Sequence, residues 1–173
     1  MSIRHLCSFG YNFLGACKTG LAIESLWYFY HESLQNVNIF HSAEQMITCE
    51  FDFNNNHNFC SMVYARNRYQ DRRILCHDLL DLSIIIHDSW TVIGDFNAIL
   101  YPSENIGPSF SSISSREFRA AIVDCNLLET NLTGGKYTWY RRHYNRIVSS
   151  KLDRALANGQ APDSCDSISY ITP

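Results

Sequence analysis

Between residues 46 and 95 the hydrophobic pattern changes its period twice, and this change constrains the fold more than any other feature of the chain. Residues 46–53 alternate as a half-buried strand does, and residues 59–65 are predicted to form the return strand. From residue 71 to residue 86 the apolar positions recur with a helical period. Residues 90–95 contain a β-branched, apolar run that predicts a buried strand. This order of strands and helix predicts a layered α/β or α+β domain.

The remaining segments carry weaker signals. The polar run Asn54 to Asn58 predicts a hairpin loop longer than the tightest types. Residues 101–115 are rich in Pro, Gly and Ser and predict a long loop. Ser114 and Glu117 have the spacing of a capping box and predict the start of a second helix. Further strands are expected at residues 20–23, 37–40 and 136–140.

Each predicted helix has an apolar face, which in a layered domain is the buried one. In the first helix the apolar positions are Ile74, Leu75, Leu79, Leu82 and Ile86. In the second helix the buried side would comprise Phe118, Ile122 and either Leu127 or Leu128.

The composition is that of one folded domain. The chain has 173 residues, of which 46% are hydrophobic and 18% are charged, so it can bury a core and does not resemble a disordered segment. The net charge of −3 gives no overall attraction to nucleic acid, so contact with DNA would need local basic patches. No apolar run approaches the roughly 18 residues of a membrane span, and no membrane partner is expected.

Cysteine usage favours a nuclear or cytoplasmic protein. The seven cysteines are irregularly spaced, with no CxxC pair and no Cys–His spacing typical of zinc sites, so reduced core thiols and no zinc are expected. Residues 6–16 faintly resemble the apolar part of a signal peptide, but Tyr11 and Asn12 interrupt them. Secretion is therefore disfavoured.

The stretch Gly94-Asp95-Phe96-Asn97 places two polar side chains where a buried strand opens into a loop. A carboxylate and a carboxamide held in this way can position a water or a metal against a phosphate. Asp95 would then orient or deprotonate the water, and Asn97 would donate hydrogen bonds to a phosphate oxygen. An Asx-turn that closes the strand is the structural alternative.

A second group of polar side chains follows the return strand. Tyr64, at the end of that strand, could donate its hydroxyl to a phosphate, although a core or rim aromatic is the commoner case. Asn67 lies close behind it. A phosphate-facing patch and an ordinary solvated surface are both compatible with the four nearby arginines, which are Arg66, Arg68, Arg72 and Arg73.

Asp153 lies between apolar residues in Leu152-Asp153-Arg154, and an aspartate in such a segment usually needs a partner. Arg154 would be a structural partner, whereas a histidine oriented by Asp153 would indicate catalysis. The seven histidines show no metal-ligand spacing. Metal ligands stay unknown, because none of the glutamates available for a magnesium site lies in a motif; these are Glu24, Glu32, Glu44 and Glu50.

Several motifs follow one another in a fixed order. They are Lys18-Thr19-Gly20-Leu21-Ala22, Val63-Tyr64-Ala65, Arg72-Arg73, Trp90 to Ile99, Glu104-Asn105-Ile106-Gly107, Gly135-Lys136-Tyr137-Thr138-Trp139 and Lys151-Leu152-Asp153-Arg154-Ala155-Leu156. The series resembles the endonuclease/exonuclease/phosphatase superfamily, which has the DNase I-like fold, and most closely the endonuclease-like domains of plant LINE-type retroelements. The resemblance covers residues 18–158 of a single partial domain spanning residues 1–173.

This resemblance implies an α+β fold, a four-layer α/β/β/α sandwich that is incomplete here. It also implies magnesium-dependent hydrolysis of a phosphodiester in DNA. By position, Asp95 would orient the attacking water, Asn97 would stabilise the transition state and Tyr64 would contact the scissile phosphate. Asp153 would buttress a catalytic histidine. The substrate-binding residues would be Asn67, Arg66 and Arg68.

The sequence also departs from the family's pattern. The metal-binding glutamate expected before Lys18 and the closing Ser-Asp-His motif are not found, and Thr19 stands where a glycine is usual. We therefore expect the ancestral nuclease activity to be weak or lost. The alternatives are a non-catalytic remnant that binds nucleic acid weakly and a phosphatase of the same superfamily. The sequence makes no prediction about oligomeric state.

Overall fold

The fold is that of a computed structural model. The structure describes residues 11–17, 26–107, 110–130, 132–133, 135–143, 146–160 and 168–169. The predicted strand at residues 20–23 and the motif at residues 18–22 lie outside these ranges.

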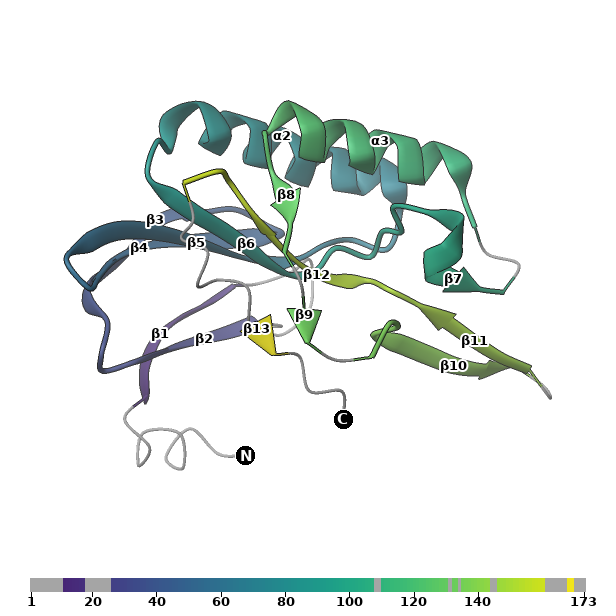
Figure 1. The fold of residues 1–173 in the computed structure, drawn as a ribbon, viewed down its shortest axis with the longest axis horizontal. Coiled ribbons are helices and arrows are strands. Elements are labelled where there is room, and N and C mark those ends of the chain that lie inside the picture. The colour runs from purple at the N-terminus through teal and green to yellow at the C-terminus, as the bar shows by residue number, and fades with distance from the viewer. Residues whose placement is uncertain are drawn as a thin grey trace.

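A mixed six-stranded sheet forms the centre of the domain (Figure 1). Its strand order is β3-β4-β5-β6-β12-β8. Only β5 and β6 are parallel, and all other neighbours in this sheet are antiparallel. The strands span Gln35–Ser42 (β3), Met46–Phe53 (β4), Asn56–Tyr64 (β5), Ser89–Asp95 (β6), Asp153–Ala157 (β12) and Leu128–Glu129 (β8).

Two helices, α2 (Tyr69–Ile85) and α3 (Ser112–Asp124), lie side by side over one face of this sheet (Figure 1). The chain passes through α2 between the parallel strands β5 and β6, since parallel neighbours need a crossover. The core forms between the helices and the sheet, where Leu75 and Leu79 of α2 and Phe118 of α3 belong to one cluster with Trp90 and Val92 of β6.

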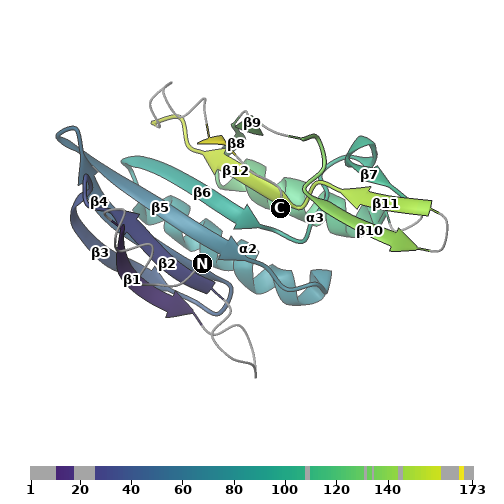
Figure 2. The ribbon, with the colours of Figure 1, turned by 90° about the horizontal axis from the view of Figure 1, so that it is seen from below.

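Smaller groups of strands complete the described part (Figure 2). On the face away from the helices β1 (Tyr11–Cys17) pairs with β2 (Leu26–His31), and β9 (Leu132–Thr133) pairs with β13 (Ile168–Ser169). Beyond β12 lie β10 (Trp139–His143), β11 (Arg146–Ser150) and β7 (Asn105–Ile106). Both α-helices in the described ranges lie on the same face of the large sheet, so the second helical layer of the predicted sandwich is not among these residues.

The predicted strand at residues 46–53 is confirmed with the same bounds, but the prediction of a long hairpin loop after it was wrong. The turn consists of Asn54 and Asn55, whose φ angles are 51° and 63°. Asparagine tolerates this left-handed conformation better than most residues, and two such residues make the tightest type of hairpin turn.

The first helix is confirmed, although it begins at Tyr69 rather than at residue 71. Ile74 was wrongly assigned to its buried face, because this side chain is 53% exposed. The other predicted positions, Leu75, Leu79, Leu82 and Ile86, are buried. Arg72 lies on the same buried stripe, three residues before Leu75.

The predicted long loop at residues 101–115 was wrong in part. It contains a short 3-10 helix, η1 (Pro102–Glu104), the strand β7 and the start of α3. The N-cap of α3 is Ser111 rather than Ser114, and its Oγ accepts the Ser114 N–H at 3.4 Å. The buried residue that follows α3 is Leu127, whereas Leu128 is 68% exposed.

The strand predicted at residues 136–140 is displaced, because β10 begins at Trp139. Thr138 N–H donates to the Ser150 carbonyl, and Thr138 Oγ1 accepts the N–H groups of Leu152 and Asp153, each at 3.0 Å. Thr138, which directly precedes β10, therefore holds the start of β12 by hydrogen bonds.

Four of the seven cysteines have side chains that the structure describes. Cys49 and Cys125 are buried, Cys60 and Cys76 are half-buried, and none of these cysteines forms a disulfide. Burial raises the pKa of the Cys49 and Cys125 thiols to about 11. Among the described helices, none has the length and apolar character needed to cross a membrane.

Candidate functional site

Tyr64, Asp95 and Asp153 lie in one row across three neighbouring strands. Tyr64 on β5 is paired with Asp95 on β6, and Asp95 is paired with Asp153 on β12. Paired residues on neighbouring strands project from the same face of a sheet. Val92 faces the helices, so Asp95, three positions further along β6, lies on the opposite face. The sheet thus brings together three of the predicted catalytic residues.

Asn97 lies directly beyond this row, in the loop that follows β6. Its N–H donates to Asp95 Oδ1 at 2.8 Å, which forms the Asx-turn considered as the structural alternative. Its Nδ2 donates to the Ala65 carbonyl at 2.7 Å, and Ala65 is the residue after Tyr64. Asn97 has a φ of 48° in this conformation. The turn therefore fixes the fourth predicted catalytic residue against the ends of both parallel strands.

Gly94 allows β5 and β6 to approach each other at the level of the site. Its φ is +137°, a region that disfavours any side chain. A Cβ atom at this position would lie 2.1 Å from the Val63 carbonyl oxygen. The glycine before Asp95 is therefore required by the close packing of the two strands.

Burial raises the pKa of Asp95, and the negative charge of Asp153 raises it further. The Asn97 N–H and the Arg72 guanidinium oppose this shift only in part. Asp95 therefore holds a proton more readily than an exposed aspartate does. Within the described ranges no group of three or more His, Cys, Asp or Glu side chains is placed to hold a metal ion.

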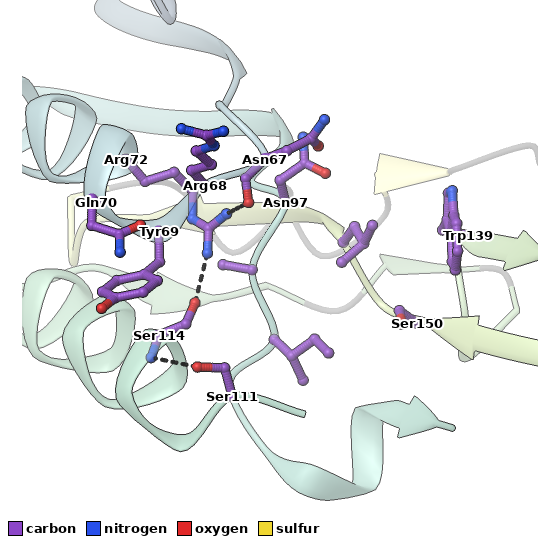
Figure 3. A pocket seen from close by; sticks show the side chains of 13 residues that line it. Asn67, Arg68, Tyr69, Gln70, Arg72, Asn97, Ser111, Ser114, Trp139 and Ser150 are labelled. Carbon is purple, nitrogen blue, oxygen red and sulfur yellow. Dashed lines mark hydrogen bonds between the residues drawn. The ribbon is translucent and has the colours of Figure 1, made fainter. Parts of the chain in front are cut away.

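A cavity of about 560 Å³ opens beside Asn97 (Figure 3). Asn67 and Arg68 line it from the loop before α2, Ser111 and Ser114 from the start of α3, and Trp139 from β10. In Figure 3 Trp139 stands on the side of the cavity away from the helices. The N-terminus of α2 has no side-chain cap, so its first N–H groups favour a negatively charged ligand.

Arg72 lies at this cavity but does not form a phosphate-facing patch. It is 8% exposed, and its guanidinium donates to the carbonyls of Arg66 and Asn67 at 2.9 and 2.8 Å. A third bond runs from Nη2 to Ser114 Oγ at 2.6 Å (Figure 3). Arg72 therefore joins the loop that follows Tyr64 to the start of α3.

The four arginines of this region do not act as one patch. Arg66 pairs with Glu44, and Arg73 pairs with Glu117 at 2.6 Å. Arg68 is exposed and lines the cavity, and none of the ion pairs formed within the described ranges involves it. Arg68 is therefore the arginine best placed to meet an anionic ligand.

Of the two partners that the sequence left open for Asp153, Arg154 is not the one, because its guanidinium pairs elsewhere. Consecutive residues of a strand point to opposite faces, and Arg154 pairs with Glu104 and Glu129 on the helix side of the sheet. In the part of the chain that the structure describes, neither an ion pair nor a histidine hydrogen bond involves the Asp153 carboxylate.

Two residues of the site were missed by the sequence analysis. Trp139 belongs to a motif there but received no role. Gln45 is 1% exposed, and its side chain donates to the Asp71 carbonyl and accepts the Arg66 N–H. It therefore holds the loop that carries Asn67 and Arg68. No sequence pattern signalled this role, because glutamine is mostly a surface residue.

No family model matches the sequence, and neither does any curated protein. Solved structures do match. The endonuclease domain of TRAS1, a telomere-specific non-LTR retrotransposon, has a TM-score of 0.66 and 10% identity, over 87% of this chain and 68% of that one. The 3′ phosphatase NExo from Neisseria, bound to a product DNA hairpin, has a TM-score of 0.62 and 14% identity, over 92% and 71% of the two chains.

A β-toxin from Staphylococcus aureus, with bound magnesium ions, matches less closely. Its TM-score is 0.50 at 13% identity, over 78% of this chain and 53% of that one. A member of the endonuclease/exonuclease/phosphatase family is among the other matches. These likenesses confirm the α+β, DNase I-like fold predicted from the sequence. Identities of this size show a shared fold and no more.

Proposed function

We propose that this chain, which has the DNase I-like fold, is a retroelement-derived endonuclease-like domain that binds DNA and hydrolyses its phosphodiester bonds weakly. The row of Tyr64, Asp95 and Asp153 beside Asn97 carries the proposal. These residue types suit phosphate chemistry, and no packing requirement accounts for two carboxylates at paired positions.

The proposed roles of Asp95, Tyr64 and Asn97 follow from their surroundings. The raised pKa of Asp95 suits a group that accepts a proton from water or holds that water in place. Tyr64 is 42% exposed, so its hydroxyl can donate to a phosphate oxygen of a long substrate. The amide of Asn97, fixed by its bonds to Asp95 and Ala65, can stabilise charge on the phosphate.

Magnesium is the metal implied by the resemblance, and a β-toxin of this fold binds magnesium ions. Asp95 and Asp153 are the described carboxylates that would hold it, because a cation would offset the repulsion that helps to raise the pKa of Asp95. Mg²⁺ prefers oxygen ligands and is often bound by one or two carboxylates with waters and substrate phosphates. The bound ion would supply neutralisation of phosphate charge.

DNA is proposed as the substrate because the cavity next to the row combines an aromatic ring, a cation and an uncapped helix start. Trp139 is 39% exposed and offers a face on which a base can stack. Arg68 would contact the backbone. The TRAS1 endonuclease domain and NExo, with its DNA hairpin, support a nucleic-acid substrate by analogy of fold.

Weak activity is proposed because Asp153 orients no histidine within the described ranges. The competing proposals are a remnant that binds DNA without cleaving it and a phosphatase of the same fold. The remnant would show binding without nicking, and the phosphatase would release phosphate from a 3′-phosphorylated oligonucleotide without nicking a plasmid.

A nicking assay on supercoiled plasmid with magnesium tests the proposal. We expect slow nicking that EDTA stops and that falls at least tenfold in Asp95→Asn. Asp81→Asn, an exposed change on α2, is the matched control and should nick at the parent rate. Nicking that persists in Asp95→Asn, or no nicking by the parent chain, would contradict it.

Binding is tested separately with a fluorescent single-stranded oligonucleotide, whose bases are free to stack on an aromatic ring. Trp139→Ala should weaken binding by about 1–3 kcal/mol, the usual value of one stacked base. Tyr140→Ala is the matched control, because this neighbouring ring is 55% exposed and does not line the cavity. Equal effects of the two variants would show that Trp139 has no stacking role.

A further inference from the structure

A buried ion pair lies on the opposite side of the sheet from the catalytic row. Arg154 of β12 and Glu104 of η1 are 2% and 7% exposed. Arg154 Nη1 donates to Glu104 Oε1 at 3.0 Å and Nη2 donates to Oε2 at 2.5 Å, so the contact is bidentate. A bidentate pair of this kind fixes geometry as well as charge.

The same two side chains hold the loop that follows Asn97. Glu104 Oε2 accepts the backbone N–H groups of Leu100 and Tyr101 at 2.8 and 3.3 Å. Arg154 Nη2 donates to the carbonyl of Ala98, the residue directly after Asn97, at 3.4 Å. Hydrogen bonds to these two side chains therefore hold the loop at Ala98, Leu100 and Tyr101, all within four residues of Asn97.

The pair also holds the segment that leads to Asp153. Arg154 follows Asp153 directly, its Nη2 donates to the Lys151 carbonyl at 3.2 Å, and the Lys151 N–H donates to the Glu104 carbonyl at 3.0 Å. A bond from the Phe96 N–H to the Leu152 carbonyl, at 2.9 Å, joins the same two segments closer to the site. The ion pair thus connects the backbones next to Asn97 and next to Asp153.

We infer that Glu104 and Arg154 are positioning residues that set Asn97 and Asp153 relative to each other. The inference rests on the proposed function for its relevance to cleavage. The hydrogen bonds that hold the two backbone segments together belong to the fold and do not depend on that function. Neither side chain touches the row, so both act through the backbone. Removing one partner would leave the other charge buried and free the loop around Asn97.

The chain offers a matched control on the same guanidinium. Glu129 also accepts from Arg154 Nη1, at 2.7 Å, and it pairs with Lys151 Nζ at 3.0 Å. Its side chain is 27% exposed, and among the described residues its hydrogen bonds and ion pairs go to Arg154 and Lys151 rather than to the loop that follows Asn97. Glu104→Gln and Glu129→Gln therefore each remove one negative charge next to the Arg154 guanidinium, but only Glu104→Gln should disturb that loop.

Amide hydrogen exchange of the full chain provides a readout that needs no activity. In Glu104→Gln we expect the Asn97, Leu100 and Tyr101 amides to exchange at least tenfold faster, with Thr48 and Ser61 unchanged. Glu129→Gln should leave all five unchanged. If Asn97 keeps its protection while Leu100 and Tyr101 lose theirs, or if all five accelerate together, the inference is overturned.

Two further arms keep the test decisive. Arg154→Lys, which keeps the charge but loses the bidentate contact, replaces Glu104→Gln if that variant does not fold, with the same expected exchange pattern. In the nicking assay Glu104→Gln should lower kcat at least tenfold without raising KM, and a change in KM alone would count against positioning. If the parent chain does not nick, the proposed function fails, and the exchange result still decides the inference.

Discussion

Asp95 and Asp153 occupy directly paired positions on β6 and β12, so two carboxylates project from the same face of neighbouring strands. Like charges at paired positions destabilise a sheet. Burial and this repulsion raise the pKa of Asp95 in the folded state. The fold tolerates the arrangement at a cost in stability, as is common at functional sites.

This arrangement makes stability depend on pH. The pKa of Asp95 is higher in the folded state than in the unfolded state. Asp95 therefore contributes stability at a pH below its unfolded-state pKa, and this contribution is lost as the pH rises through its folded-state pKa. With EDTA present, Asp95→Asn should therefore raise the urea midpoint at pH 8 more than at pH 4. Asp81→Asn is the control, and urea unfolding at both pH values is the measurement. An equal shift at both pH values would argue against a raised pKa of Asp95 in the folded state.

Gly94→Ala should destabilise the chain by about 3 kcal/mol or more, because a side chain would combine a disfavoured φ with a backbone clash at Val63. Gly159→Ala is the matched control, since an added Cβ there meets nothing within 4 Å. Urea unfolding followed by circular dichroism measures both. A small effect at Gly94 would mean that β5 and β6 can separate without cost.

A buried chain of hydrogen bonds crosses the core from Trp90 to Thr48. Trp90 Nε1 donates to Ser61 Oγ at 2.9 Å, and that oxygen lies 2.7 Å from Thr48 Oγ1. Ser61→Ala would leave the indole N–H without a partner and should cost about 1–3 kcal/mol. Ser112→Ala, at an exposed position of α3, should change stability by less than about 0.5 kcal/mol. Calorimetric or urea unfolding distinguishes these values.

DNA binding should depend on Arg68 more than on Arg73. Arg68 lines the cavity, whereas Arg73 is paired with Glu117. Arg68→Ala should weaken binding to duplex DNA and lower the salt slope of log K by about 1, as expected for one lost phosphate contact. Fluorescence anisotropy at several salt concentrations measures the DNA binding of Arg68→Ala and of the control Arg73→Ala. If Arg73→Ala has the larger effect, DNA lies on the helices rather than at the cavity.

The sequence predicted the parts of the fold in which local pattern and tertiary packing agree. The alternation at residues 46–53 and the apolar run before Asp95 both became central strands. Residues whose roles depend on distant partners were not predictable. The burial of Arg72 could not be predicted, because its hydrogen-bond acceptors are two backbone carbonyls and a serine on another helix, which no sequence pattern connects to it. Only sheet register revealed that Asp153 belongs beside Asp95.

The site also depends on the order in which the chain assembles. Tyr64 and Asp95 come together only after α2 has crossed over the sheet, and Asp153 joins them only when β12 pairs with β6. Contacts between segments far apart in sequence form slowly, because a long loop must close first. The row is therefore expected to form late in folding, and loss of β12 from the sheet would remove it while the hairpin of β4 and β5 persists.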